Sequence, residues 1–468
     1  MTNNLSESET SLLLDTFMYL NYYDAAEGQK LSDILLDLSH QQDYQRAGAY
    51  YEEYAILEAA VAENPGFGEL TIGIQSVNMG FDSGTSACLF QEPGAGTIYV
   101  VYRGTGDGEW LDNGRGLTME TTIQQERALT YFEQAMEQGG FTEAQRIIIT
   151  GHSKGGNKAQ FVTMESDARY AALIDRCISV DGQGFSNEAV VRWQQGLGVA
   201  EYQTRTGKLY GINGENDFIS GLGNTIIPRE QIRFLHTPVE RGNVAGYHDI
   251  KYLFASRDGQ GAIVFGGASN RVVSGQKEWG RLATELSTRV MAMPLEERAG
   301  CAAAIMQIME LGGEQKSGIN GEKVTLTDLW HLLMTGLPTV FATLINSTEG
   351  EELIDSIIGK GGQNGCVFAV NLSGLLNQAG ALMRIAAQLD SVALEVKAVA
   401  VQLRTSLQIG VSDNSWLLTT KINRECDRIH NDAAGMNRLA GVLEQAVKIY
   451  SFGEQTIASV GEQTIASI

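Results

Sequence analysis

The stretch Ile147-Ile148-Ile149-Thr150-Gly151-His152-Ser153-Lys154-Gly155 decides the fold of the first part of the chain. Its three isoleucines are typical of a buried strand, and the residues from Asn157 to Arg169 are typical of a helix. A serine between two glycines at such a strand-to-helix turn is the pattern of a nucleophile elbow, which lifts the Ser153 hydroxyl clear of the sheet. Side chains in place of Gly151 and Gly155 would clash with the neighbouring strand and helix. The pattern therefore predicts a nucleophile at Ser153; the alternative is a glycine-rich turn with an idle serine.

Strand-like and helix-like stretches alternate on both sides of this turn. Strands are expected at Leu70–Val77, Ser86–Gln91, Thr97–Tyr102, Arg146–Thr150, Cys177–Val180, Lys208–Asn213 and Ile232–His236. Helices are expected at Ser11–Tyr23, Leu31–Leu38, Gln41–Glu63, Thr122–Gln138 and Lys154–Arg169. Alternation of this kind indicates an α/β domain with a mainly parallel sheet. We expect this domain to cover residues 1–265.

The rest of the chain is expected to be helical. Residues 266–365 form a linker region with helix-like stretches at Glu278–Met293, Leu295–Leu311 and Thr327–Ile345. Beyond it, large apolar residues recur every seven positions and alternate with smaller ones: Leu375, Leu382, Leu389, Val396 and Leu403, then Ile422, Ile429, Met436, Leu443 and Tyr450. This pattern predicts a long antiparallel helical hairpin over residues 370–450, in a region 366–452; two core helices of a larger bundle also fit. A short repeat occupies the tail, residues 453–468.

Composition and charge narrow the class of protein. The net charge of −22 argues against a nucleic-acid partner, because a phosphate backbone would be repelled. The five cysteines are scattered, so we expect neither a disulfide framework nor a zinc site, and no cofactor or metal. Met1 to Thr10 lack the basic start and apolar core of a cleavable signal peptide. The uncharged segment Leu329–Thr348 is expected to be a buried helix or a helical hairpin, and insertion into a membrane is the alternative.

A serine nucleophile needs a general base, and the chain has six histidines. His152 is adjacent to Ser153 in the elbow, where its side chain points the wrong way to serve as base. His248 lies in a loop after the last expected strand, which is where the α/β-hydrolase order of serine, acid and histidine places the base. We favour His248, and His236, which ends a strand, remains the alternative.

The base in turn needs an acid that orients it, in a loop between Ser153 and His248. Asp217 follows the expected strand Lys208–Asn213 and is the favoured acid. Asp181 is the rival one strand earlier, where the glycines that follow it suggest a turn. Asp249 is expected to be only a neighbour of His248.

An oxyanion hole needs two hydrogen-bond donors. The Lys154 N–H at the start of the helix is one candidate, because helix N-termini present unpaired N–H groups. Thr105, which follows the expected strand Thr97–Tyr102, is the second, through its N–H, to which its hydroxyl could add. An ordinary strand-to-helix turn at Thr105 is the alternative.

With these residues in place, the first 265 residues resemble the class 3 lipase-like α/β-hydrolases, particularly their bacterial Mbeg-like branch. The matching pieces are Leu12–Leu20, Tyr102-Arg103-Gly104-Thr105, Gly151-His152-Ser153-Lys154-Gly155-Gly156, Asn216-Asp217 and His248-Asp249. The resemblance implies an oxyanion role for Thr105 and a lipid acyl ester as substrate, as in phospholipases A and lysophospholipases. A thioesterase, a peptidase or an esterase for small esters uses the same machinery and stays open. So does a non-catalytic scaffold with a degenerate hydrolase fold.

The C-terminal region resembles a second group, the substrates of type VII secretion. Their export signal is Y-x-x-x-[DE], and Tyr450 and Glu454 match it directly after the expected hairpin. A lipase followed by a targeting hairpin is similar to LXG-type effectors in reverse orientation. The resemblance implies export from the cytoplasm without a cleavable signal peptide and small helical partner proteins, and it leaves room for an immunity protein.

Overall fold

The structure is a computed structural model of the whole chain. It describes residues 5–20, 25–76, 86–94, 96–106, 109–141, 145–239, 245–254, 272–295 and 298–299, and a few single positions beyond these. The chain divides into two compact units, Met1–Leu353 and Ile354–Ile468. In the second unit the described positions are helical: Arg384, Ala387, Ser391, Leu394, Ala398 and Cys426. These six positions apart, the hairpin expected over 370–450 lies outside the described residues, as do the pair Tyr450 and Glu454 and the segment Leu329–Thr348.

An eight-stranded sheet organises the first unit, and its strands follow one another in chain order. They are β1 Thr71–Gln75, β2 Ala87–Gln91, β3 Thr97–Tyr102, β4 Arg146–His152, β5 Ile174–Val180, β6 Leu209–Gly214, β7 Ile232–Leu235 and β8 Val272–Val273. The strands from β3 to β7 pair in parallel, while β1, β2 and β8 pair antiparallel at the two edges. The mainly parallel sheet expected from the sequence is therefore confirmed.

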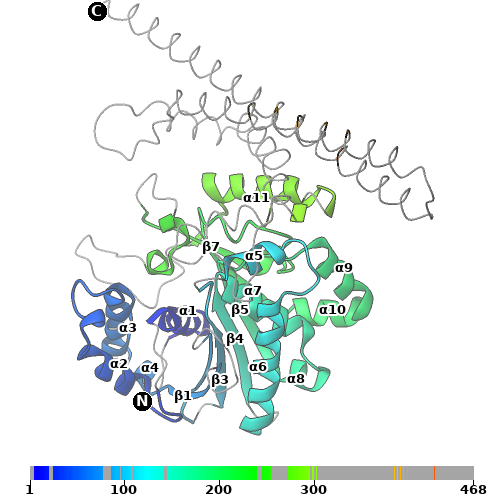
Figure 1. Cartoon of the computed structure of the whole chain (residues 1–468). Helices are drawn as coiled ribbons and strands as arrows, with labels where there is room; N and C mark the ends of the chain where they lie inside the picture. The colour runs from blue at the N-terminus through cyan, green and yellow to red at the C-terminus, as the bar shows by residue number, and fades with distance from the viewer. Residues whose placement is uncertain are drawn as a thin grey trace, which may run out of the picture. The chain divides into compact units, whose positions relative to one another are not determined.

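Helices cover both faces of this sheet (Figure 1). One face carries the helices that connect the parallel strands: α6 Ile123–Gly139, α7 Lys154–Glu165, α8 Ala168–Leu173, α9 Asn187–Gly196 and α10 Gly198–Thr206. They share a face because right-handed crossovers between strands laid down in one direction all return on the same side. The N-terminal helices cover the opposite face: α1 Glu7–Phe17, α2 Leu31–Ser39 and α3 Tyr51–Glu63.

The two hydrophobic cores follow from the alternation of side chains along each strand. In β4, Ile147 and Ile149 pack with α6 and α7, whereas Ile148 packs with α1 and α3. All three isoleucines are fully buried, because successive side chains of a strand point to opposite faces and both faces are covered.

Three expected helices have different bounds in the structure. The helix expected over Gln41–Glu63 is a 3-10 turn, Gln42–Tyr44, followed by α3 from Tyr51, because the chain turns sharply at Gly48. A Cβ on Gly48 would lie 2.2 Å from the Asp43 carbonyl oxygen. The helix expected to end at Arg169 is two helices, since Asp167 caps a new one at Ala168. The first helix begins at Glu7, where Ser6 caps it, and passes into the 3-10 turn η1 Met18–Leu20.

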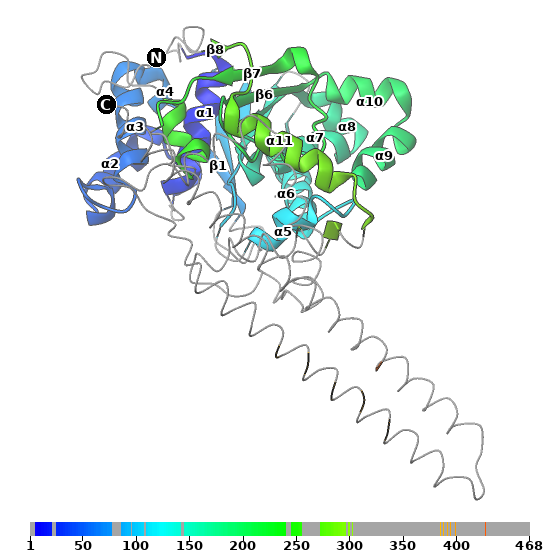
Figure 2. The same ribbon diagram turned by 90° about the horizontal axis from the view of Figure 1, so that it is seen from above.

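The α/β domain also extends past the end expected near residue 265. Strand β8 pairs antiparallel with β7, and helix α11, Glu278–Met291, follows it. In Figures 1 and 2, α11 lies beside the β6 and β7 end of the sheet. Its Trp279 N–H donates to Asn216 Oδ1, and the Ser287 hydroxyl accepts from the Gly223 N–H. Helix α11 therefore packs on the loop that follows β6.

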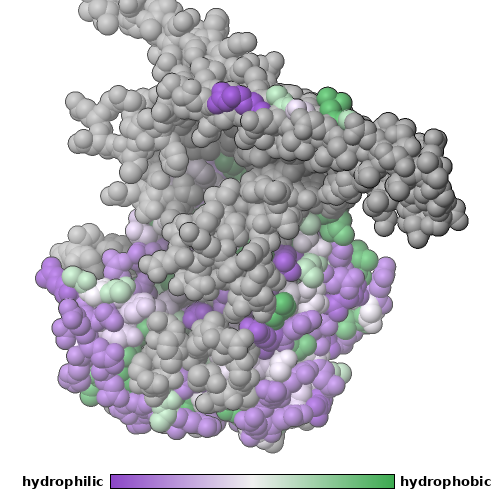
Figure 3. All heavy atoms as spheres, viewed as in Figure 1, coloured by the Kyte–Doolittle hydropathy of each residue, from purple (hydrophilic) through white to green (hydrophobic). Residues whose placement is uncertain are grey.

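The described surface of the first unit is mostly hydrophilic on the face seen in Figure 3. Hydrophilic side chains cover most of this face, and apolar ones are scattered among them. None of the helices that the structure describes is long and apolar enough to cross a membrane.

Candidate active site

Ser153 stands at the tight turn between β4 and α7. Its φ of 60° and ψ of −126° are a strained conformation for a residue with a side chain. The two flanking glycines make the turn possible. A Cβ on Gly151 would lie 2.3 Å from the Gly155 carbonyl carbon, and one on Gly155 would lie 2.1 Å from the Tyr102 carbonyl oxygen. The clash expected at these two glycines is therefore confirmed.

The structure brings together the three residues that the sequence analysis favours. His248 Nε2 lies 2.7 Å from Ser153 Oγ, and His248 Nδ1 lies 2.6 Å from Asp217 Oδ1. Asp217 comes from the loop after β6, and His248 from the 3-10 turn η5, Ala245–His248. Ser153 is 5% exposed and Asp217 is fully buried. A serine, an imidazole and a carboxylate are thus joined in the order that general-base activation of a nucleophile requires.

Backbone groups hold Asp217 in place. Its Oδ2 accepts a hydrogen bond of 2.6 Å from the Ser220 N–H, and its own N–H donates to the Gly214 carbonyl. With the Asp217 carboxylate as acceptor, the Nδ1 of His248 carries the hydrogen. The Nε2 of His248 is then free to accept the proton of the Ser153 hydroxyl.

The alternatives lie in other surroundings. His236 Nδ1 lies 2.5 Å from Glu215 Oε1, and the His236 side chain is 53% exposed. Asp249 caps the 3-10 turn η6, Ile250–Leu253, and forms an ion pair of 2.8 Å with Lys251. Asp181 is buried directly after β5 and interacts with Asp217, the proposed acid of the triad.

The loop after β3 lies over the nucleophile. A Cβ on Gly104 would be 3.3 Å from the Ser153 Cβ, so the two chain segments are in close contact. The Asn113 side-chain amide donates to Thr105 Oγ1 over 2.7 Å, which orients that hydroxyl. The first N–H groups of α7, beginning with that of Lys154, have no partner within the helix. Both proposed oxyanion donors, Thr105 and Lys154, therefore sit on segments that border Ser153.

A buried charge network beside this loop was not foreseen from the sequence. The Lys154 side chain is fully buried, and its Nζ lies 2.9 Å from Asp112 Oδ2. One turn along α7, the Nζ of Lys158 donates to the Arg103 carbonyl, and burial lowers the pKa of Lys158 to about 8. Two lysines four residues apart are usually an exposed helix face, so only the packing reveals that these two tie α7 to the chain around Thr105.

A polar row between α1 and β4 was also not foreseen. Thr150 Oγ1 donates to Asp15 Oδ2 over 3.0 Å, and the Tyr19 hydroxyl lies 2.6 Å from His152 Nδ1. Asp15 lies in the last turn of α1 and Tyr19 in the 3-10 turn η1 that continues it, so their side chains follow one another along β4 as Thr150 and His152 do. The sequence contains this matched spacing of polar residues. It can be recognised only when the helical segment and the strand are already known to pack against each other.

His152 also supports the proposed base directly. Its ring stacks on that of His248, with the ring centroids 4.7 Å apart and the planes 27° from parallel. Burial lowers the pKa of His152 well below its usual range, and the charge of His248 adds to the effect. A neutral imidazole therefore stacks on the ring of the proposed base.

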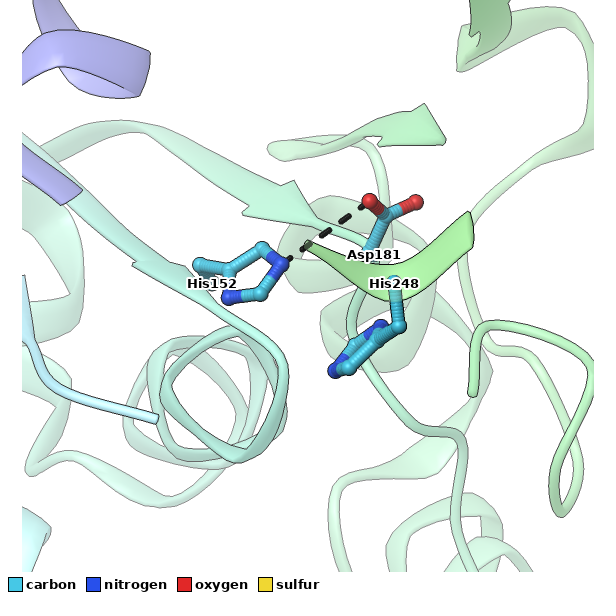
Figure 4. Close-up of side chains that lie close together, drawn as sticks. All are labelled: His152, Asp181 and His248. Atoms are coloured by element: carbon cyan, nitrogen blue, oxygen red, sulfur yellow. Dashed lines mark ion pairs between the residues drawn. The ribbon is translucent and has the colours of Figure 1, made fainter. Parts of the chain in front are cut away.

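Among the described residues, His152, Asp181 and His248 are spaced closely enough to be considered as metal ligands (Figure 4). One candidate ligand atom from each lies within 4.8 Å of the others. The hydrogen bonds speak against resident metal, because both ring nitrogens of His248 already contact Ser153 and Asp217. We assign no metal to this group.

Comparison with known proteins adds a family for part of the chain. No curated protein matches the sequence. Residues 61–208 match the model of the Mbeg1-like family, and this range includes Thr105 and the elbow at Ser153 but ends before Asp217 and His248. Over residues 61–208, which contain strands β1 to β5 of the sheet, the chain is therefore similar to the Mbeg1-like family.

Proposed function

We propose that this protein is a serine carboxylic-ester hydrolase that acts on acyl esters of lipids. The observation that carries the proposal is the unbroken chain of hydrogen bonds from Ser153 through His248 to Asp217. It starts at a strained elbow, and backbone strain of this kind is maintained where function needs it. The alternative, a serine without function in a glycine-rich turn, gives no reason for a histidine–carboxylate pair hydrogen-bonded to that serine.

The geometry implies the order of proton transfers. Ser153 Oγ attacks the ester carbonyl while His248 Nε2 takes up its proton, and Asp217 stabilises the imidazolium that forms. The N–H groups of Lys154 and Thr105 hold the negative charge that develops on the carbonyl oxygen. His248 then passes its proton to the departing alcohol. Water, deprotonated by His248, releases the acyl group from Ser153.

The lipid substrate is the finer part of the proposal. It is supported by the Mbeg1-like match and by the resemblance to lipases, and phospholipase A or lysophospholipase activity is the form we favour. An esterase for small esters or a thioesterase would use the same residues, so the choice of substrate decides between them.

The test is hydrolysis of a short-chain ester, a long-chain ester and phosphatidylcholine by wild type, Ser153→Ala and Ser166→Ala. Ser166 is a matched control, since it is a buried serine at the far end of α7. We expect lipid cleavage by wild type and Ser166→Ala, and its loss in Ser153→Ala. Cleavage of the short ester alone would replace the lipase by an esterase. No cleavage by folded wild type, or full activity of Ser153→Ala, would contradict the proposal.

We further propose that the protein is exported by a type VII route, on the basis of the sequence alone. The support is the Y-x-x-x-E pattern formed by Tyr450 and Glu454 after the heptad repeats. In a bacterium with a type VII system, we expect Tyr450→Ala to abolish export and Gln455→Ala to leave it unchanged. Export of the Tyr450→Ala variant would contradict this route.

A further inference from the structure

A second buried carboxyl group lies against Asp217. Asp181 follows β5, one strand before Asp217, and each residue is at most 1% exposed. Both converge on Gly214 at the end of β6: the Gly214 N–H donates to Asp181 Oδ1 over 2.7 Å, and the Gly214 carbonyl accepts from the Asp217 N–H. The two carboxyl groups are close enough to interact, and the Asp217 carboxylate acts on Asp181 both as a neighbouring charge and as a hydrogen-bond partner.

The backbone at Asp181 is in a strained conformation. Asp181 has a φ of 46°, one of three positive values among the non-glycine residues that the structure describes. Aspartate tolerates this left-handed conformation better than most residues, but glycine would adopt it freely. The presence of a carboxyl side chain at such a position, buried against the proposed catalytic acid, therefore needs a physical explanation.

The charges around Asp181 decide its protonation. The titratable described groups that face its carboxyl are Asp217 from the β6 loop, His152 from the elbow, His248 from η5 and Tyr19 from η1. The Nε2 atom of His152 lies 3.9 Å from Oδ2 of Asp181 (Figure 4). The His152 ring is neutral, so it places no positive charge beside Asp181. Burial, and then the charge of Asp217, raise the pKa of Asp181 well above its usual range.

Two carboxylates cannot share a hydrogen bond unless one of them holds a proton. Asp217 already accepts hydrogen bonds from the Ser220 N–H and from His248, which suit a charged acceptor. Asp181 accepts one backbone N–H, from Gly214. The proton therefore belongs on Asp181, and the negative charge on Asp217.

We propose that Asp181 is a positioning residue of the triad: a neutral carboxylic acid that donates its proton to Asp217 and thereby holds that carboxylate, charged and oriented, against His248. The proposal rests on the proposed function for its kinetic consequence. Its protonation state is a property of the folded protein whether or not the protein cleaves an ester.

The first test is therefore thermal unfolding of wild type and Asp181→Asn between pH 4 and pH 8. A carboxyl whose pKa is raised on folding stabilises the protein at low pH, and this stabilisation is lost as the pH rises toward the folded-state pKa. An asparagine does not titrate there. We expect the Tm of Asp181→Asn relative to wild type to rise with pH. Asp15, whose pKa burial also raises, is present in both proteins, so its effect cancels. A difference that stays flat or falls with pH would overturn the proposal.

The second test is kinetic, with an ester that the wild type cleaves. Asparagine can still donate to Asp217 and accept from Gly214, so Asp181→Asn should keep kcat within about threefold and leave the acid limb of the kcat/KM profile in place. Asp181→Leu cannot donate, and should lower kcat by about 10- to 100-fold with little change in KM, as for other outer-shell partners.

Equal loss in both variants, an acid limb displaced by Asp181→Asn, or full activity of folded Asp181→Leu would overturn the role of Asp181. If Asp181→Leu fails to fold, Asp181→Asn decides by itself. If wild type cleaves no ester, the proposed function fails, and the unfolding experiment still decides whether Asp181 holds the proton.

Discussion

Two histidine–carboxylate pairs share the loop after β6, and only one of them faces the nucleophile. In each, a histidine Nδ1 meets a carboxylate oxygen: His236 and Glu215 at 2.5 Å, His248 and Asp217 at 2.6 Å. The carboxylates are two residues apart in the chain and both are buried. The chemistry of the two pairs is thus the same at the level of contacts.

Their surroundings differ. Glu215 also binds Lys277 over 2.8 Å, and the His236 side chain is half exposed, so this pair ties β7 and the start of α11 to the β6 loop. The His248 side chain is 14% exposed, stacks on His152 and reaches Ser153. A histidine–carboxylate pair therefore indicates a general base only where the second ring nitrogen meets a nucleophile.

The largest expected effect separates the two histidines. His248→Gln removes the group that takes the proton of Ser153, so ester hydrolysis should fall by about 1,000,000-fold. His236→Gln should retain activity within about twofold, because its ring does not face Ser153. Steady-state kinetics of both variants measures this, and a comparable loss in both would remove the distinction drawn here.

The two acids should separate almost as strongly. Asp217→Asn leaves His248 without its charged partner and favours the wrong tautomer, so we expect kcat to fall by about 10,000-fold. Glu215→Gln should leave kcat within about threefold but lower the free energy of unfolding by about 1–2 kcal/mol, because Lys277 and His236 lose their carboxylate. Chemical denaturation beside kinetics distinguishes these outcomes. Loss of kcat in Glu215→Gln would show that its pair belongs to the site.

The smallest expected effect concerns the His152 ring, which stacks on His248. Among the described residues, no such ring contact is found at His236. Tyr19→Phe removes the hydroxyl that holds His152 Nδ1 at 2.6 Å, and the ring that backs His248 is then less firmly placed. We expect kcat to fall by about three- to tenfold with KM unchanged, since the loss of one buried hydrogen bond is worth about 1 kcal/mol. The matched control is Tyr44→Phe, whose hydroxyl donates to the Leu20 carbonyl at the end of η1. A rise in KM alone would place Tyr19 in substrate binding instead.

The sequence by itself determined the parts of this protein that depend on neighbours in the chain. The glycines around Ser153 predicted the elbow, because a Cβ at position 151 would clash with the backbone of Gly155, only four residues along the chain. Alternating strands and helices predicted the mainly parallel sheet. The triad residues were favoured by chain order, and the structure brings those three together; their catalytic roles stay predictions until the variants are measured.

Tertiary structure decided what depends on packing between distant segments. Ser153 and His248 are 95 residues apart, and the sequence favoured His248 over His236 only by its place in a loop. Both histidines follow the β6 loop and both pair with an acid, so only packing shows which ring reaches Ser153. The same holds for Asp181, which looks like a turn residue in the sequence. Burial against Asp217 turns it into a carboxyl group that must hold a proton, because the cost of a second buried charge is set by distance and desolvation, which a sequence does not express.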